Sequence, residues 1–208
     1  QSGLDFINRI DPEHPDRHLY ATSMACGGVA VGDLNGDGRP DLFLTSGADR
    51  NRLYLQTDTF IFEDVTAKTG IEIRKAWSAG VAIADIDNDG DLDIYVCHYD
   101  EPNSLLINQG LDAEGIPTFV DEARVRKANV RAASLSPALA DYDGDGDLDI
   151  FLLTSRFSYP EGTALSAEGI YDVGPKGRAF VLPRYNKYFR IADTRKDLET
   201  GKLIVELA

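Results

Sequence analysis

The sequence predicts an all-β protein built from repeated four-stranded antiparallel sheets. Two observations predict this fold class: a nine-residue acidic motif occurs three times, and short apolar runs flank the copies in the same order. The runs are rich in β-branched and aromatic residues and are too short for helices, which is typical of buried strands. The chain has 208 residues, 43% of them apolar, so it can bury a core.

The acidic motif begins at Asp33, Asp85 and Asp141, so the copies are 52 and 56 residues apart. A repeat of about 50 residues is typical of the blades of a β-propeller. Thirteen of the 35 acidic residues lie in the three copies, so much of the negative charge is concentrated in three short loops.

The predicted strands follow one order in each unit. A stretch that alternates small and apolar residues precedes the acidic loop, an apolar run follows it, and two further strands complete the unit. Small residues allow the first strand to lie where strands crowd together, such as a central axis. The expected strands are 28–32, 42–45, 51–56 and 60–65 in the first unit, 80–84, 94–97, 103–108 and 118–123 in the second, and 136–140 and 150–153 in the third.

A single sheet of this kind cannot bury both of its faces, so neighbouring sheets must stack on one another. We therefore expect one partial β-propeller over residues 1–208, with about two complete blades and part of a third. The expected parts are an N-terminal strand and lead-in at 1–26, blade 1 at 27–75, blade 2 at 76–131, and blade 3 at 132–208, with a long loop insertion at about 155–184 and a hairpin formed by strands at 185–191 and 202–206.

The acidic loops are predicted to bind calcium, one ion in each loop and three in all. Positions 1, 3, 5 and 9 carry Asp or Asn, position 7 can offer its carbonyl, and a glycine at position 6 allows the sharp turn that brings the oxygens together. Ligands that are all oxygen indicate a hard cation. The predicted ligands are Asp33, Asn35, Asp37, Asp41 and the carbonyl of Arg39; Asp85, Asp87, Asp89, Asp93 and the carbonyl of Asp91; and Asp141, Asp143, Asp145, Asp149 and the carbonyl of Asp147.

An EF-hand is the main alternative for these loops. It requires an acidic ligand at position 12 and a helix that leaves the loop. Position 12 is Leu44, Val96 or Leu152, and a β-rich run follows each loop. Solvated hairpin turns without metal are the other alternative, but three copies in fixed phase with their flanking strands favour the metal site.

Composition restricts the partners. The net charge of -14 argues against nucleic acid as the main partner, and no apolar run approaches the roughly 20 residues that span a bilayer. The two cysteines, Cys26 and Cys97, favour buried free thiols over a disulfide scaffold. Because the chain begins with Gln1, we expect that an upstream stretch, such as a signal peptide, has been removed.

The sequence shows no nucleophile elbow, phosphate-binding loop or zinc-protease motif, and we expect no catalytic residues. Cys97 and His98 are adjacent on a strand and should point to opposite faces, which disfavours a dyad. Trp77 is expected in the core. A candidate binding surface combines aromatic and basic side chains near the long insertion. Its residues are Tyr159, Tyr171, Tyr185, Tyr188, Arg156, Arg178 and Arg184.

The acidic repeats resemble FG-GAP/VCBS repeats, the calcium-loop blades of integrin α-type β-propellers. The stretches 3–6, 28–31 and 62–71 also resemble the ASPIC/UnbV and cartilage acidic protein group. The resemblance implies a seven-bladed ring in a secreted or surface protein. Because seven blades need about 350 residues, we expect the chain to be a fragment, with residues 4–10 as a lone strand that closes the ring.

The expected function is that of a secreted, periplasmic or cell-surface scaffold for binding or adhesion, with calcium in a structural role and a protein or glycan as ligand. One alternative is a propeller-based polysaccharide hydrolase or lyase, in which acidic pairs would act as acid and base. A carboxylate that already binds calcium is a poor proton shuttle, which disfavours this alternative. The other alternative is a structural subunit of a larger surface assembly.

Overall fold

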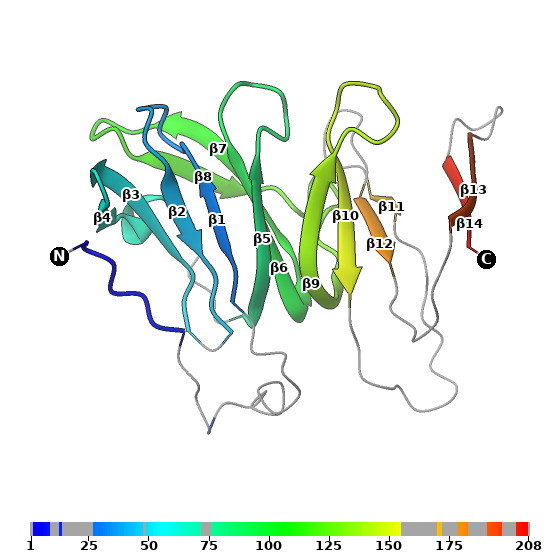
Figure 1. The fold of residues 1–208 in the computed structure, drawn as a ribbon, viewed down its shortest axis with the longest axis horizontal. Helices are drawn as coiled ribbons and strands as arrows, with labels where there is room; N and C mark the ends of the chain where they lie inside the picture. The colour runs from blue at the N-terminus through cyan, green and yellow to red at the C-terminus, as the bar shows by residue number, and fades with distance from the viewer. Residues whose placement is uncertain are drawn as a thin grey trace.

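The computed structural model is all-β, as predicted, and its strands form two large sheets and one separate hairpin (Figure 1). The structure describes residues 2–8, 13, 27–47, 49–71 and 76–154, together with the backbone of four short strands after residue 169. No helix in the described part of the chain is long and apolar enough to cross a membrane.

The first sheet is a four-stranded antiparallel meander, in the strand order that the sequence predicts. Its strands are β1 (Val29–Gly32), β2 (Asp41–Leu44), β3 (Arg52–Asp58) and β4 (Ile61–Asp64). A short 3-10 turn, Thr66–Lys68, follows the last strand. Each strand pairs with the next one in the chain, which is the arrangement expected of a propeller blade.

The second meander repeats this pattern and lies beside the first (Figure 1). Its strands are β5 (Ser78–Ala84), β6 (Asp93–Pro102), β7 (Ser104–Leu111) and β8 (Pro117–Asp121). Buried side chains of both meanders form one apolar cluster, in which Phe43 and Leu53 of the first pack with Ile94 and Val96 of the second. This contact provides the face-to-face packing that a single sheet lacks.

The third unit begins as predicted and then departs from the meander. β9 (Arg131–Ala140) pairs antiparallel with β10 (Asp149–Thr154). β12 (Ala179–Leu182) then pairs parallel with β10, and β11 (Ile170–Tyr171) pairs with β12. Both of these strands lie within the segment that the sequence predicts to be a loop insertion.

A C-terminal hairpin is present, as predicted, and its first strand is described from Ile191 onward. β13 (Ile191–Lys196) and β14 (Leu203–Leu207) pair antiparallel. The predicted first strand, 185–191, shares only Ile191 with β13, and the rest of the predicted range lies outside the described residues. The second strand agrees with the prediction to within one residue.

Strands β6 and β9 are both longer than predicted, and their extensions pair with each other at Tyr99 and Ala133. This pairing joins the second and third units into one continuous sheet. Partly buried and exposed residues alternate along the predicted part of β9 but not along its extension. A register shift also interrupts the pairing of β6 with β5 and that of β9 with β10. Local periodicity therefore gave no signal for them.

The N-terminal segment corrects one prediction. Residues 2–8, which include most of the predicted strand at 4–10, form no strand. They instead run beside the outer part of the first sheet, where the Ser2 carbonyl accepts a hydrogen bond from the Phe62 amide at 2.7 Å and Asp5 accepts one from the Tyr54 hydroxyl at 2.6 Å. Asn8 Oδ1 also accepts a hydrogen bond from the Ser46 hydroxyl at 3.1 Å, so separate hydrogen bonds hold this segment in place of a strand ladder.

The first strands of the three units crowd together, as the small residues predict. A Cβ atom on Gly28 would lie 2.9 Å from the carbonyl oxygen of Ala79, and one on Gly80 would lie 2.4 Å from that of Leu135. Real Cβ atoms do not approach backbone atoms so closely, so only glycine fits at these positions. The prediction that Trp77 packs in the core is also confirmed, since its side chain is 3% exposed.

Candidate metal centres in the acidic loops

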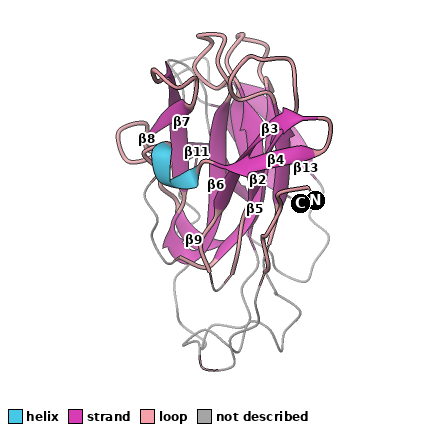
Figure 2. Cartoon of the chain, turned by 90° about the vertical axis from the view of Figure 1, so that its left-hand side faces the viewer, coloured by secondary structure: helices cyan, strands magenta, loops and turns pink. Residues whose placement is uncertain are grey.

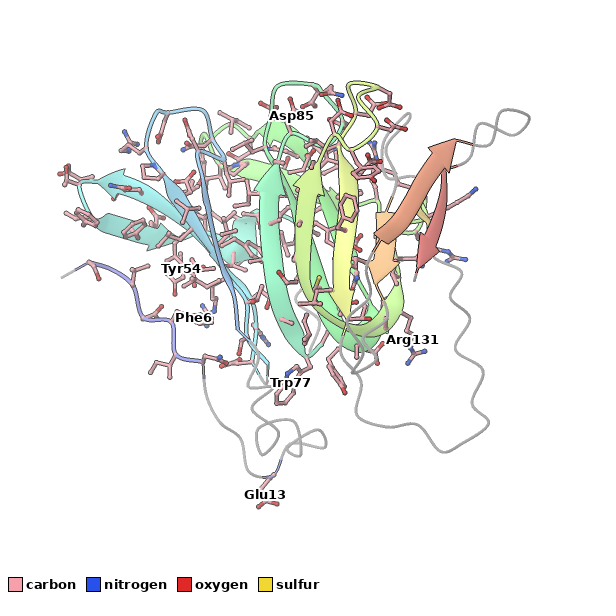
Figure 3. The ribbon with its side chains drawn as sticks, turned by 45° about the vertical axis from the view of Figure 1, so that its right-hand side comes forward. Phe6, Glu13, Tyr54, Trp77, Asp85 and Arg131 are labelled. Carbon is pink, nitrogen blue, oxygen red and sulfur yellow. The ribbon has the colours of Figure 1, made fainter. Side chains whose placement is uncertain are left out.

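The three acidic loops lie at the same end of consecutive sheets, where they connect β1 to β2, β5 to β6 and β9 to β10 (Figure 1). We call them loop 1 (33–41), loop 2 (85–93) and loop 3 (141–149). Figure 3 labels Asp85 at this end of the molecule and Trp77 at the opposite end. A strand follows every loop, so these are not EF-hands, which need a helix after the loop.

The first aspartate of each loop organises the turn. Its carboxylate accepts hydrogen bonds from the backbone amides of the fifth and sixth residues of the loop. The distances are 3.0 and 2.8 Å for Asp33, 3.1 and 3.0 Å for Asp85, and 3.1 and 3.1 Å for Asp141. The sixth residue is always a glycine with φ between 84° and 98°, a conformation that other residues rarely adopt.

The ninth aspartate joins the loop to the sheet. Asp41 and Asp93 are fully buried, and each accepts one amide from the second residue of its loop and one from the third strand of its sheet, at 2.8–2.9 Å. Asp149 accepts the Tyr142 amide at 3.0 Å. Burial raises the pKa of Asp41 and of Asp93 to about 6, against the opposing effect of these hydrogen bonds.

Two of the loops each bring three of their own carboxylates together. Oxygen atoms of Asp85, Asp87 and Asp89 lie within 4.8 Å of one another in loop 2, and those of Asp141, Asp143 and Asp149 do so in loop 3. Asp93 and Asp145, which are also predicted ligands, are not part of these groups. Like charges at this separation repel one another, and a divalent cation between them would reverse that repulsion.

Loop 1 is arranged differently, and no comparable group of three acidic residues occurs there among the described side chains. The Arg39 guanidinium forms an ion pair with Asp37, and the side-chain amide of Asn35 donates to the same carboxylate at 3.0 Å. The neutral Asn35 stands where the other two loops have aspartate. Loop 1 therefore has less negative charge to balance than loops 2 and 3.

Loop 2 contacts a basic residue that the sequence gave no reason to single out. Arg126 donates to Asp87 Oδ2 at 3.0 Å and to Glu122 at 2.8 Å. The other oxygen, Asp87 Oδ1, is buried and has no hydrogen-bond partner among the described residues. Burial, followed by the Asp89 carboxylate, raises the pKa of Asp87 above its ordinary value.

The donor sets of loops 2 and 3 fit a calcium ion. They consist of hard carboxylate oxygens that are already close together, and in loop 2 one buried oxygen lacks a partner. A bound calcium ion would supply a positive charge that holds the carboxylates in place. Amide hydrogen bonds position the first and ninth aspartates of these loops, while Arg126 and the Asp91 amide hold Asp87 and Asp89.

A second polar group lies inside the sheet, away from the loops. The ring nitrogens of His98 lie 3.1 Å from the hydroxyls of both Ser78 and Ser104, and the His98 amide donates to Asn103 at 2.9 Å. Cys97, next to it, points into the apolar core as a free thiol, and burial raises the pKa of that thiol. The side chains alternate as expected, and the histidine has a structural role.

The candidate aromatic and basic binding surface cannot be placed. The side chains of Tyr159, Tyr171, Tyr185, Tyr188, Arg156, Arg178 and Arg184 lie outside the described residues, and so does Cys26.

Comparisons with known proteins place the repeats in a recognised class. Residues 33–96, which include loops 1 and 2, match the model of the FG-GAP-like repeat. Together with the antiparallel four-stranded sheets, this match confirms the resemblance to FG-GAP-type blades. The chain therefore contains an FG-GAP-like, blade-forming repeat.

The chain is also similar to cartilage acidic protein 1 from several vertebrates. It is 26% identical to the Xenopus tropicalis protein over 152 residues, which are 73% of this chain and 22% of the relative. It is 28% identical to the Mus musculus and Homo sapiens proteins over 162 residues, or 72% of this chain. The matched region spans about a quarter of the length of these relatives.

Proposed function

We propose that this chain is part of a calcium-stabilised extracellular β-propeller that acts as a scaffold for binding or adhesion, with a protein or a glycan as ligand. One observation supports it above the others: consecutive sheets present acidic loops of equal length at one end, and two of these loops gather three carboxylates each within 4.8 Å. Calcium has a structural role in this proposal.

Calcium would stabilise the loops through charge. Two carboxylates about 4 Å apart repel each other by up to about 4 kcal/mol at an effective dielectric constant near 20, and each gathered group contains several such pairs. A divalent ion replaces this repulsion with attraction. Because the ninth aspartate of loop 2 is bonded to the third strand of its sheet, an ordered loop also fixes the geometry of the blade.

The location follows from the chemistry and from the relatives. Extracellular calcium-binding modules work at about 0.1–1 mM calcium, far above the level in a resting cytosol. The similarity to a protein named for cartilage supports the same setting. Three bound ions would change the formal charge from -14 to about -8, which leaves the surface acidic.

We also propose that the acidic residues of the loops do not catalyse a reaction. Asp33, Asp85 and Asp141 already accept backbone amides, and carboxylates committed to a metal transfer protons poorly. The ligand would bind to side chains outside the metal loops.

Removal of calcium tests the proposal. At calcium ten times above the dissociation constant, each occupied site adds about 1.4 kcal/mol of stability. The melting temperature, followed by circular dichroism, should therefore fall by several degrees when EDTA is added and recover with excess calcium. Excess magnesium serves as the control, since it prefers a stricter geometry and should restore less. A melting temperature that is unchanged in EDTA would show that the proposal is wrong.

A further inference from the structure

Loops 2 and 3 are joined by one side chain. Asn88, the fourth residue of loop 2, donates from Nδ2 to Asp147 Oδ1 at 3.0 Å and also lies 3.4 Å from the carbonyl oxygen of Gly146. Both acceptors belong to loop 3, which comes from the next unit of the same sheet. The two loops that gather three carboxylates are therefore in direct contact.

The backbone alone does not require an asparagine at this position. Asn88 has a φ of 62°, and the equivalent residues of loops 1 and 3 are Gly36 and Gly144, with φ of 70° and 74°. Glycine is the usual residue in this left-handed region, and asparagine is one of the few others that tolerate it. What asparagine adds over glycine is the side-chain amide, and that amide contacts loop 3.

The acceptor, Asp147, is unusual among its equivalents. It is only 9% exposed, whereas the seventh residues of the other loops, Arg39 and Asp91, are exposed. Its Oδ1 accepts from Asn88, and its Oδ2 is buried without a hydrogen-bond partner among the described residues. A buried carboxylate that is only half satisfied is costly, and a cation bound nearby would reduce that cost.

The remaining contacts connect this pair to the gathered carboxylates of loop 2 and to a further predicted ligand in loop 3. Asn88 lies between Asp87 and Asp89, two of the three carboxylates gathered in loop 2. On the other side, the Asp147 amide donates to the Asp145 carboxylate at 3.1 Å, and the Asp147 carbonyl is a predicted ligand in loop 3. An ion that orders either loop therefore also orders one partner of the Asn88–Asp147 hydrogen bond.

We propose that Asn88 and Asp147 couple the metal sites of loops 2 and 3, so that an ion in one loop raises the affinity of the other. This inference rests on the proposed function, because it requires that calcium binds. Coupling between sites is reciprocal, so the same factor applies in both directions. Loop 1 takes no part in this contact, because Gly36 has no side chain with which to make it.

Each loop contains its own probe for a test by NMR. The amides of Gly38, Gly90 and Gly146 donate to the first aspartate of loops 1, 2 and 3, at 2.8, 3.0 and 3.1 Å. In the 208-residue chain labelled with ¹⁵N-glycine, the shift of each amide during a calcium titration gives the midpoint for its loop. Loop 3 is disabled with Asp141→Ala, or with the milder Asp143→Asn if the first variant folds poorly.

With Asn88 present, disabling loop 3 should raise the Gly90 midpoint by about fivefold or more, the usual lower range for coupled sites. In the Asn88→Gly background, disabling loop 3 should leave the Gly90 midpoint within about twofold of its value with loop 3 intact. The reason is that the Asn88–Asp147 hydrogen bond is already absent. Asn88→Gly suits the local backbone, so it should not disturb folding, and an unchanged Gly38 midpoint is the control.

An equal shift of Gly90 with and without Asn88, or no shift in either background, would overturn the coupling but leave the proposed function intact. If none of the three glycine amides responds to calcium, both the coupling and the proposed function are wrong.

Discussion

At the scale of single residues, the aspartates of each loop divide into two roles. The first and ninth hold the backbone of the loop and its sheet through amide hydrogen bonds, and in loop 2 the third and fifth complete the gathered carboxylates. The sequence predicts every one of them as a ligand, because ligand spacing does not show which carboxylates also have a structural task. Substitutions of single aspartates can test the two roles separately.

Asp93→Ala should reduce stability even without calcium. It leaves the amides of Ile86 and Asn108 without their acceptor in a fully buried place, at a cost of about 3 kcal/mol. Urea unfolding in EDTA measures this loss. Asp89→Ala is the matched control: its side chain is exposed, so it should have little effect in EDTA and should reduce only the added stability that calcium gives. Equal losses for the two variants in EDTA would contradict the division of roles.

The buried aspartates also predict a dependence on pH. The folded-state pKa values of Asp41 and Asp93 are about 6, above the unfolded value of about 3.9. In EDTA, stability from these groups is therefore fully present below about pH 4 and is lost as the pH rises through 6. Calcium favours the ionised carboxylates, so its contribution should grow over the same range.

Melting temperatures with and without calcium at pH 4.5 and pH 7 measure this effect. The difference made by calcium should be small at pH 4.5 and large at pH 7. Asp93→Asn, which cannot titrate, is the control and should weaken the dependence. The same calcium-dependent rise in melting temperature at both pH values would contradict the prediction.

At the scale of elements, the sequence predicted the strands best where apolar runs flank the acidic loops. The alternating small residues of β1, β5 and β9 predicted both the strands and their close approach, since small side chains let neighbouring strands crowd together. The extensions of β6 and β9 and the parallel partner β12 were missed, because they depend on pairing between distant segments and not on local alternation. Arg126 was missed for a similar reason: only the fold places its turn beside loop 2.

The crowding of the first strands predicts which glycines cannot be replaced. In Gly80→Ala the new Cβ would meet backbone atoms, the carbonyl oxygen of Leu135 at 2.4 Å and Cα of Ser136 at 2.8 Å, so the free energy of unfolding should fall by about 3 kcal/mol. The control is Gly32→Ala, whose Cβ would have side-chain atoms of Ile83 and Leu92 as its nearest neighbours, at 2.9 and 3.1 Å. These can shift, so a loss of about 1 kcal/mol is expected. Urea unfolding compares the two, and a larger loss for Gly32→Ala would contradict this account.

At the scale of the whole molecule, the two large sheets stand side by side (Figure 1), and Figure 2 shows loops gathered at one end of the strands. The outward face of β1 carries Val29 and Val31, each 58% exposed, while the opposite face of the first sheet is buried against the second. The repeat predicted this stacking because each sheet needs a neighbour to bury its second face. The N-terminal segment could not be predicted, because separate hydrogen bonds to Ser46, Tyr54 and Phe62 hold it in place of a strand ladder.

The hydrogen bonds of Asn108 affect how the units would respond to an applied force. Its side chain donates to the Leu34 carbonyl in loop 1 at 3.2 Å, and its own amide donates to Asp93 in loop 2 at 2.8 Å. Asn108 thus connects loop 1 to loop 2, and the Asn88–Asp147 hydrogen bond connects loop 2 to loop 3. A tensile force applied to one of these loops would therefore be shared by all three units, and no single unit would carry it alone.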